Sequence, residues 1–448
     1  MNRINLDNAA NIFPAIARRD ATHVFRITAV MREKICPLIL QAALEDTLPF
    51  FSAFAVRLVR GKFRYYFEEN TGIPKVYLEE QPPCSYIAPE ENRQFLFRML
   101  YFEKRIHLEV FHVLTDGNGA AYFLKAVCYR YCQLAFSECF SDEERKHRYG
   151  LEHAGLIEDG YMACYIKRNP RTFQEKKAVK IKGKSRKENT PEILTALLPV
   201  VDLKKLCKGY GVSITEYISA IVLDSIYQEI RTKKKRKRAI NIFIPVNLRT
   251  IFKTETMRNF FSNILISCPA EREYLGFEDI LIEVHNQFEM KKNKTMFEER
   301  ISYTVGGEKQ RIARIAPLIA KDLILRRMYN LAKQNTTLSF SNLGVIDVQE
   351  HFQQWIEGFQ FLLDTSPEEP VRVTACSYNG MLALTVASRI YGNHLASSLV
   401  QHLTSVGIPV TLEMNQGNED TNCMDQEERV QYDCGNQGYF GILDFLLH

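Results

Sequence analysis

The chain has 448 residues, of which 46% are hydrophobic and 25% are charged, and its formal net charge is +5. This length allows two domains with cores of their own, and so small a net charge gives no support to a nucleic-acid-binding protein. No run approaches the ~20 apolar residues of a membrane-spanning helix, and the first residues lack the apolar core of a signal peptide. We therefore expect a monomeric cytoplasmic protein of enzyme size.

The strand and helix patterns begin near the N-terminus. We expect a strand at 23–30, a helix that begins at Pro37, and two strands within 53–67. The helix is expected to turn one side inward, formed by Leu38, Ala42 and Leu48.

A predicted hairpin carries the most informative residues. Its strands, at 95–101 and 106–112, are joined by Phe-Glu-Lys-Arg. Side chains alternate along the second strand, so that His112 continues an apolar row and Phe111 faces the other way. Asp116-Gly117 then breaks the strand. The apolar row is Ile106, Leu108 and Val110, and a following helix at 120–134 is expected to bury Phe123, Val127, Tyr131 and Leu134.

A neutral imidazole at the end of a strand can act as a general base. Its ordinary pKa of about 6.5 allows it to take a proton from an alcohol, amine or thiol near neutral pH. A His at the end of an apolar row is also compatible with a histidine that is simply satisfied in the core. From these residues alone, both interpretations of His112 stay open.

The cysteines are typical of free thiols. There are eleven, an odd number, and they are scattered along the chain. Cys128 and Cys132 share a face of the expected helix, but no Cys-x-x-Cys or His-x-x-x-His pair accompanies them. Core packing explains them better than zinc, so the sequence predicts no metal site.

A basic stretch at 167–189 lacks periodicity and is expected to be a linker. It divides the chain into an N-terminal domain, 1–166, and a C-terminal domain, 190–448. A second run, Lys233–Arg238, has six consecutive basic residues and invites a nucleic-acid or localisation hypothesis. A solvated loop explains this run better, because no aromatic residues interleave it.

The C-terminal part repeats the alternation of helices and strands. Ser213-Ile-Thr-Glu216 is a capping box that opens a helix to about Ile230. Residues 371–388 form a predicted hairpin around Asn379-Gly380, a dipeptide that favours a type I′ turn. Further expectations are an inward face of Tyr217, Ile218, Ile221 and Val222, strands at 239–246 and 338–344, and a helix at 394–403. Two α/β layers of similar build are therefore expected.

Three separated motifs are read together. They are His112-x-x-x-Asp116-Gly117, Pro245-Val-Asn-Leu-Arg249 with Asn263 downstream, and Ser341-Asn342-Leu343-Gly344. In this order they resemble the chloramphenicol-acetyltransferase-like superfamily, and most of all its alcohol acetyltransferases. Wax-ester synthases, plant-type acyltransferases and condensation domains are wider relatives. The opening, Leu6-Asp-Asn-Ala-Ala-Asn-Ile-Phe-Pro14, also resembles bacterial alcohol-acetyltransferase-like proteins, and the resemblance covers roughly 4–412.

The resemblance implies an α/β (α+β) fold of two similar domains in a V, with an active-site tunnel between them. It implies that His112 takes the proton of a hydroxyl or amine while that atom attacks a thioester carbonyl, without an acyl-enzyme. The family has a second His where this chain has Phe111, but alternation sends residue 111 to the opposite face. Asp116 would turn away from the reaction and pair with Arg249.

The resemblance also points to weaker candidates. Gly117 would allow close approach by a substrate or the second domain, although an ordinary turn glycine fits equally. The polar residues Ser339, Ser341 and Asn342 lie where relatives contact the thioester or the oxyanion, and each is also a common turn former. Asn263 could fix the loop after Arg249, or be a plain loop residue.

The sequence leaves the substrates open. The leading hypothesis has acyl-CoA as co-substrate, a small-molecule acceptor and no bound cofactor. The alternatives are a carrier-protein thioester, whose acidic carrier could dock on the basic residues 176–187, and a catalytically silent protein that binds a thioester or a partner. Acyl length and O- or N-acylation depend on the shape of the site. The tail, 415–448, could pack as a helix, contact a membrane or join a partner.

Overall fold

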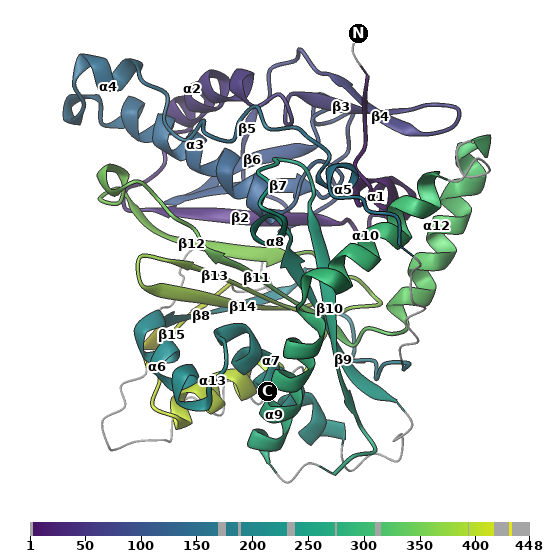
Figure 1. Cartoon of the computed structure of the whole chain (residues 1–448). Coiled ribbons are helices and arrows are strands. Elements are labelled where there is room, and N and C mark those ends of the chain that lie inside the picture. Colours follow the sequence, from purple (N-terminus) through teal and green to yellow (C-terminus); the bar gives the residue numbers. More distant parts are fainter. Residues whose placement is uncertain are drawn as a thin grey trace.

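The computed structural model describes residues 3–168, 176–186, 190–230, 238–273, 276–309, 315–392, 394–415 and 430–431. Two large sheets lie between two layers of helices (Figure 1). The fold is therefore of the mixed α/β class, as predicted. None of the helices in these ranges is long and apolar enough to cross a membrane.

The first sheet has the strand order β12-β2-β7-β6-β5. The strands are β12 (Ile356–Leu363), β2 (Val24–Met31), β7 (Arg105–Phe111), β6 (Phe97–Phe102) and β5 (Val76–Leu78). The helices α2 (Pro37–Thr47) and α3 (Gly117–Ala135) cover one face (Figure 1). The predicted hairpin is β6 and β7, and the apolar row of β7 lies in the core under these helices.

Both helices differ in detail from the sequence predictions. In α2 the prediction of the inward side is wrong: Leu38 is 80% exposed and Ala42 is exposed, although Leu48 is buried. The buried stripe is Leu40, Ala43, Leu44 and Thr47, whose spacing of three and four residues fits one face of a helix. Asp116 caps α3, so that this helix begins three residues earlier than predicted, at Gly117, and Leu134 is only partly buried.

The second sheet has the order β10-β9-β11-β13-β14-β8-β15-β16. The strands are β10 (Phe261–Pro269), β9 (Ala239–Asn247), β11 (Leu338–Val345), β13 (Val371–Tyr378), β14 (Met381–Ser388), β8 (Glu192–Pro199), β15 (Thr411–Met414) and β16 (Val430–Gln431). On its outer side lie α6 (Val200–Tyr210), α7 (Ile214–Ile230), α9 (Phe277–Lys291) and α13 (Leu395–Ser405) (Figure 1). Asn379 and Gly380 both have positive φ, and Ser213 and Glu216 form the predicted capping box.

The strand β12 ties the two sheets together. It follows β11 in the chain but pairs with β2 of the first sheet. Side chains of β13 close its free edge, because Thr374, Cys376 and Tyr378 each donate a hydrogen bond to a β12 carbonyl. The part of the expected linker at 176–186 runs beside the second sheet, bridging at Ala239 and Ile390.

Three sequence hypotheses fall on residues that the structure does not describe. Most of the basic run Lys233–Arg238 and almost all of the tail 415–448 lie outside the described residues, as do 169–175 and 187–189 of the expected linker. The domain boundaries stay a prediction.

Candidate active site

His112 lies directly after β7, at the end of the first sheet. Its N–H donates to the carbonyl of His23 at 2.9 Å, which extends the pairing of β7 with β2 by one residue. The backbone on both sides is therefore fixed, and the orientation of the imidazole depends on the side chains around it.

The amide of Asn259 fixes the tautomer of His112. Its Oδ1 lies 3.0 Å from His112 Nδ1, while its Nδ2 donates to the His112 carbonyl at 3.1 Å and to Asp7 Oδ2 at 3.4 Å. A carbonyl can only accept, so the NH2 end of the amide must face it and the oxygen must face the ring. Nδ1 therefore carries the proton. No hydrogen bond to Nε2 is found among the described residues, and its lone pair can accept another proton.

Three aromatic rings surround this imidazole. Phe13 stacks on it with ring centroids 4.6 Å apart, and Phe25 and Phe261 approach to 5.1 and 5.5 Å. Burial lowers the pKa of His112, and the charge of Asp116 opposes this only in part. The ring is accordingly neutral at pH 7, which is the form that can accept a proton.

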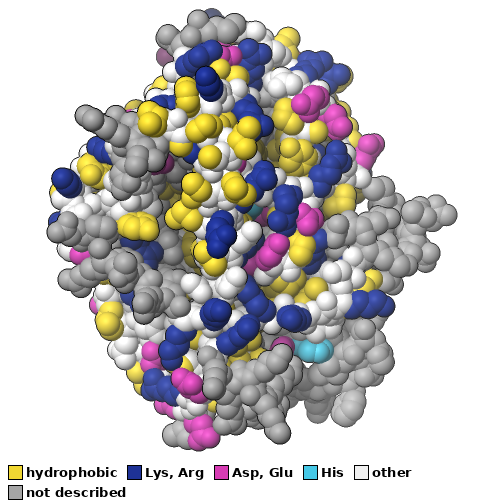
Figure 2. Space-filling view, turned by 90° about the vertical axis from the view of Figure 1, so that its right-hand side faces the viewer, with side chains coloured by type: hydrophobic (Ala, Val, Ile, Leu, Met, Phe, Trp, Pro, Cys, Tyr) yellow, Lys and Arg dark blue, Asp and Glu magenta, His cyan; other side chains and the backbone are white. Residues whose placement is uncertain are grey.

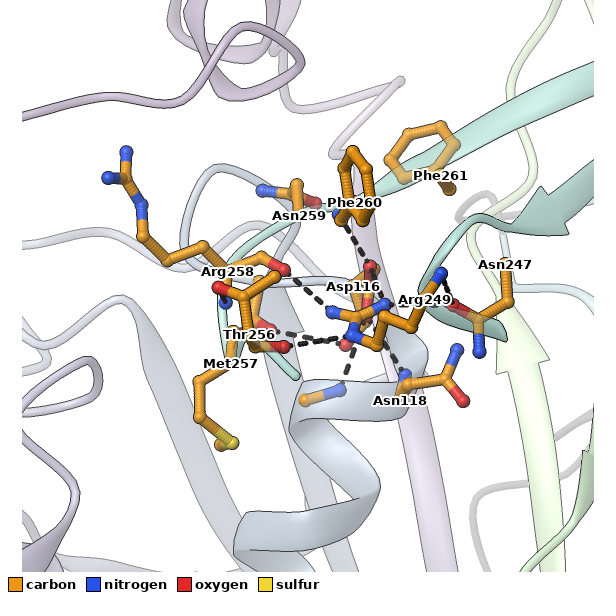
Figure 3. A network of polar contacts seen from close by, with 12 residues as sticks. Asp116, Asn118, Asn247, Arg249, Thr256, Met257, Arg258, Asn259, Phe260 and Phe261 are labelled. Carbon is orange, nitrogen blue, oxygen red and sulfur yellow. Dashed lines mark hydrogen bonds and ion pairs between the residues drawn. The ribbon is translucent and has the colours of Figure 1, made fainter. Parts of the chain in front are cut away.

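Asp116 turns toward Arg249 (Figure 3). The guanidinium donates to both carboxylate oxygens, at 2.9 and 3.0 Å, and both residues are buried. The same carboxylate caps α3 through two backbone N–H groups and accepts a third from Phe260. Every hydrogen bond that the structure shows for this carboxylate thus holds the turn or the ion pair, and none goes to His112.

Arg249 also fixes the segment that carries Asn259. It begins the short helix α8 (Arg249–Phe252), and two further N–H groups of its guanidinium donate to the carbonyls of Thr256 and Arg258, at 2.8 and 2.7 Å. Asn259 follows immediately. The ion pair therefore holds in place both the turn after His112 and the amide that orients its ring (Figure 3).

Two glycines allow the C-terminal half to approach the start of α3. A Cβ at Gly117 would lie 2.3 Å from Leu343 Cδ2, and one at Gly119 would lie 2.4 Å from the carbonyl oxygen of Met257. Neither position accepts a side chain without a shift of its neighbour. The group that meets Gly117 is thus the turn at the end of β11.

The two serines of β11 lie on one face of the strand but have different surroundings. Ser339 donates to Glu369 at 2.8 Å, within a buried cluster that includes Lys333. Ser341 is also buried, and it pairs in register with Thr374 of β13. Among the described residues, no hydrogen bond to the Ser341 hydroxyl is found. The Ser341 hydroxyl thus differs from that of Ser339, because it has no hydrogen-bond partner in the part of the chain that the structure describes.

The two asparagine candidates, Asn342 and Asn263, take part in hydrogen bonds that hold the fold. Asn342 donates to Thr215 at 3.1 Å and accepts from the N–H of Gly344, so it holds its own turn. Asn263 lies on β10 opposite Pro245, and its carbonyl accepts from Arg300. The amide that reaches His112 is that of Asn259, four residues before Asn263.

Sequence reasoning missed three residues of this site: Asn259, Asp7 and Phe13. Asp7 is fully buried, and burial raises its pKa to about 7 against the opposing charge of Arg258. Asp7 and Phe13 lie in the opening segment whose resemblance the sequence does show, but nothing in that segment indicates contact with residue 112. For Asn259, only the folding of the loop after Arg249 brings the amide to the ring.

A cavity of about 260 Å³ lies near His23. Its wall includes Tyr329, whose hydroxyl lies 3.5 Å from His23 Nε2. The His23 ring is in turn 5.7 Å from Phe13, the ring that stacks on His112. Burial lowers the pKa of His23 to about 4, so this ring is also neutral. Two side chains thus separate the cavity wall from His112.

One cluster has ligand types that suit a metal ion. Glu216, His285 and Glu289, on α7 and α9, have ligand atoms within 4.8 Å of one another. Both carboxylate oxygens of Glu216 already take part in hydrogen bonds, one with the backbone of Ser213 and the other with His285 Nδ1. The capping box and this contact account for the cluster without an ion.

No family model and no curated protein matches the sequence. Solved structures match over most of the chain. Trichothecene 15-O-acetyltransferase from Fusarium sporotrichioides is 10% identical, with a TM-score of 0.55, and the match covers 89% of this chain and 93% of that chain. TRI101 from the same organism, complexed with coenzyme A and T-2, is 11% identical, with a TM-score of 0.57 and coverage of 91% and 99%.

The first condensation domain of the CDA synthetase is 13% identical, with a TM-score of 0.55 and coverage of 90% and 95%. The chain therefore has the fold of the chloramphenicol-acetyltransferase-like and condensation-domain structures. This confirms the resemblance in fold that the ordered motifs predict.

Proposed function

We propose that this protein is an acyltransferase that moves an acyl group from a coenzyme A thioester to the hydroxyl or amine of a small acceptor. The observation that carries the proposal is the His112 ring, which is neutral and has Nδ1 bound to Asn259, while no hydrogen bond to Nε2 is found within the described ranges. The shared fold supports it, because one similar structure is a 15-O-acetyltransferase and another contains coenzyme A.

The chemistry that this arrangement supports is direct transfer. Nε2 of His112 takes the proton of the acceptor O–H or N–H while that atom forms a bond to the thioester carbonyl carbon. The carbon–sulfur bond then breaks, and the departing sulfur takes the proton from Nε2. The hydrogen bonds shown for the His112 ring in the described ranges involve an amide and no Ser or Cys side chain, so no acyl-enzyme is needed.

Two further groups have assigned tasks in this proposal. The Asp116–Arg249 pair holds the His112 turn and the Asn259 segment, and takes no proton. The Ser341 hydroxyl is our candidate donor to the developing oxyanion, since Ser339 and Asn342 donate elsewhere. A donor of this kind contributes about 3–4 kcal/mol to transition-state stability in other enzymes.

Thiol release tests the function. The purified protein is mixed with acetyl-CoA or longer acyl-CoA and with pooled alcohols and amines, and free thiol is followed beside His112→Gln. We expect release that depends on an acceptor and is lost in the variant, and mass analysis of the mixture then identifies the product. Equal release by the variant would exclude His112 as the base.

A carrier-protein thioester is the second candidate donor, because the fold is shared with a condensation domain. The same assay with a phosphopantetheine-bound acyl group separates the two donors. Release from the carrier and not from free acyl-CoA would assign the chain to the condensation type. If neither donor reacts while a thermal shift still reports binding, the protein is a silent binder.

A further inference from the structure

The helix α12 (Leu318–Lys333) buries two charged side chains besides Leu318 and leaves several large apolar side chains exposed. Asp322 and Lys333 point inward, and Asp322 accepts a hydrogen bond from Tyr65 at 3.0 Å. Five apolar side chains point to solvent and are between 51% and 74% exposed: Ile319, Leu323, Ile324, Met328 and Leu331. We call these five residues the outer face of α12.

This outer face is not isolated. Ile315, just before the helix, is 71% exposed, and Phe63 of the neighbouring hairpin is 41% exposed. On this side of the molecule, hydrophobic side chains gather with Lys and Arg among them (Figure 2). Soluble proteins seldom leave such a patch exposed unless it binds a partner or a membrane.

Basic residues border the outer face on two sides. Lys321, Arg326 and Arg327 lie on α12 itself. The hairpin of β3 (Val56–Arg60) and β4 (Tyr65–Glu69) packs against the start of the helix, where the N–H of Leu318 donates to the Lys62 carbonyl. Its turn contributes three more cations, Arg60, Lys62 and Arg64.

The acids near this surface are engaged. Asp322 is turned inward toward Tyr65 and Arg60, and Glu308 of α10 (Lys294–Lys309) accepts from Asn11. An apolar face bordered by cations is complementary to an anionic lipid bilayer, whose interface accepts apolar side chains and whose headgroups attract Lys and Arg. A second copy of the chain fits less well, because a symmetric contact would bring the same cations together.

The helix also borders the cavity described above. Arg326, Tyr329 and Lys333 of α12 line it, and Tyr329 contacts His23, whose carbonyl binds the His112 N–H. One side of the helix therefore lines the cavity, which His23 and Phe13 separate from the candidate base, while the adjacent side is apolar and exposed.

From this juxtaposition we propose that the outer face of α12 docks the protein on the surface of an anionic lipid bilayer. We further infer, resting on the proposed function, that the acceptor is an alcohol or amine with a long apolar tail that is taken from that bilayer through the cavity. The docking itself does not depend on catalysis.

Vesicle flotation of the full chain tests the docking. The probes are vesicles of phosphatidylcholine alone and of phosphatidylcholine with phosphatidylserine in equal parts. We expect binding to the anionic vesicles, weakened about fivefold in Arg327→Gln. In the triple variant Ile319→Ser, Leu323→Ser, Leu331→Ser we expect binding to be weakened at least about tenfold.

The matched control removes three equally exposed apolar side chains elsewhere. In the triple variant Leu38→Ser, Val201→Ser, Ile282→Ser, binding should equal that of the unchanged protein, because these residues lie on α2, α6 and α9. His112→Gln should also bind normally, which separates failed docking from failed catalysis. Equal binding by both triple variants, or no vesicle binding by the unchanged protein, overturns the docking.

Sedimentation of the same proteins without lipid tests the competing occupant. A concentration-dependent dimer that the α12 triple variant loses would assign the face to a second copy and overturn the bilayer.

The acceptor is tested by thiol release with a long-chain alcohol in anionic vesicles and with a water-soluble short-chain alcohol. The α12 triple variant should lose rate only with the first, and equal rates with both would overturn the acceptor class.

Discussion

His107 lies near the start of β7 and His112 directly after its last residue, and their environments differ. Both rings have a pKa that burial lowers, so both are neutral near pH 7. His107 is enclosed: its Nδ1 is 2.8 Å from Thr28 Oγ1, and its Nε2 is 3.2 Å from Glu79 Oε2. For the His112 ring, the hydrogen bond found among the described residues is that of Nδ1.

This difference teaches that burial alone does not distinguish a candidate base from a structural histidine. What distinguishes His112 is one nitrogen held by an acceptor of fixed orientation and one left free. The opposite face of β7 shows the contrast, because there His107 lies beside Glu109 in a buried network with Arg26. The predictions below change the environment of one histidine and compare the result with a matched control variant.

Replacing the two histidines should give opposite results. His112→Gln removes the proposed base, so kcat/KM should fall by about a hundred- to ten-thousandfold, with little change in the free energy of unfolding. His107→Gln disturbs contacts to Thr28 and Glu79 and should cost about 1–3 kcal/mol of stability, with kcat/KM retained. Kinetics and urea unfolding of both variants decide this, and a loss of activity in both would remove the contrast.

The two buried ion-pair networks should differ in their effect on catalysis. Arg249→Gln leaves Asp116 buried without its partner and should cost about 3–5 kcal/mol of stability. Arg26→Gln leaves Glu109 buried with Arg98 as its remaining partner, so it should cost less. Only Arg249→Gln loosens the Asn259 segment, so among the molecules that remain folded it alone should lower kcat/KM. Adding Asp116→Asn to it should restore part of the stability. Equal kinetics in the two single variants would contradict the role given to Arg249.

Two asparagines test the orientation of the ring. Asn259→Ala removes the acceptor of His112 Nδ1, and kcat/KM should fall about ten- to a hundredfold, the scale typical of groups that orient a reacting imidazole. Asn263→Ala, four residues further along, should leave the rate unchanged. Steady-state kinetics of both variants is the measurement, and the reverse order would restore Asn263 as the site residue.

The elements that sequence predicts well are those with local chemistry. The hairpin at 371–388 follows from Asn379-Gly380, and the start of α7 follows from the capping box at Ser213, because turn and cap residues act within a few positions. Local chemistry does not decide which side of α2 faces inward. It depends on where α3 lies, so the apolar Leu38 could be placed on the wrong face.

The residues of the candidate site also fall into those that the sequence predicts and those that it does not. His112 and Asp116 follow from strand alternation and the break after it, and the pairing with Arg249 follows from the order of motifs in the family that the chain resembles. Asn259 and Asp7 do not follow. Asn259 contacts both Asp7 and His112, which joins residues from three distant segments, and no spacing in the sequence encodes these contacts.

The pH dependence of stability and of kcat/KM should also distinguish the two histidines, and this is the smallest effect that we expect. A folded-state pKa below the unfolded value of about 6.5 means that the unfolded chain binds more protons between these values, so stability falls as pH drops through this window. His107→Gln should reduce that fall.

Catalysis depends on His112 alone, so the acid limb of kcat/KM should lie below about pH 6.5 and stay in place in His107→Gln. The hydrogen bond that His112 Nδ1 donates to the amide oxygen of Asn259 raises the pKa of His112 against the larger effect of burial. In Asn259→Ala the acid limb should therefore move to lower pH, measured from about pH 5 to about pH 8, whereas a shift to higher pH would show that the amide does not act on the charged ring.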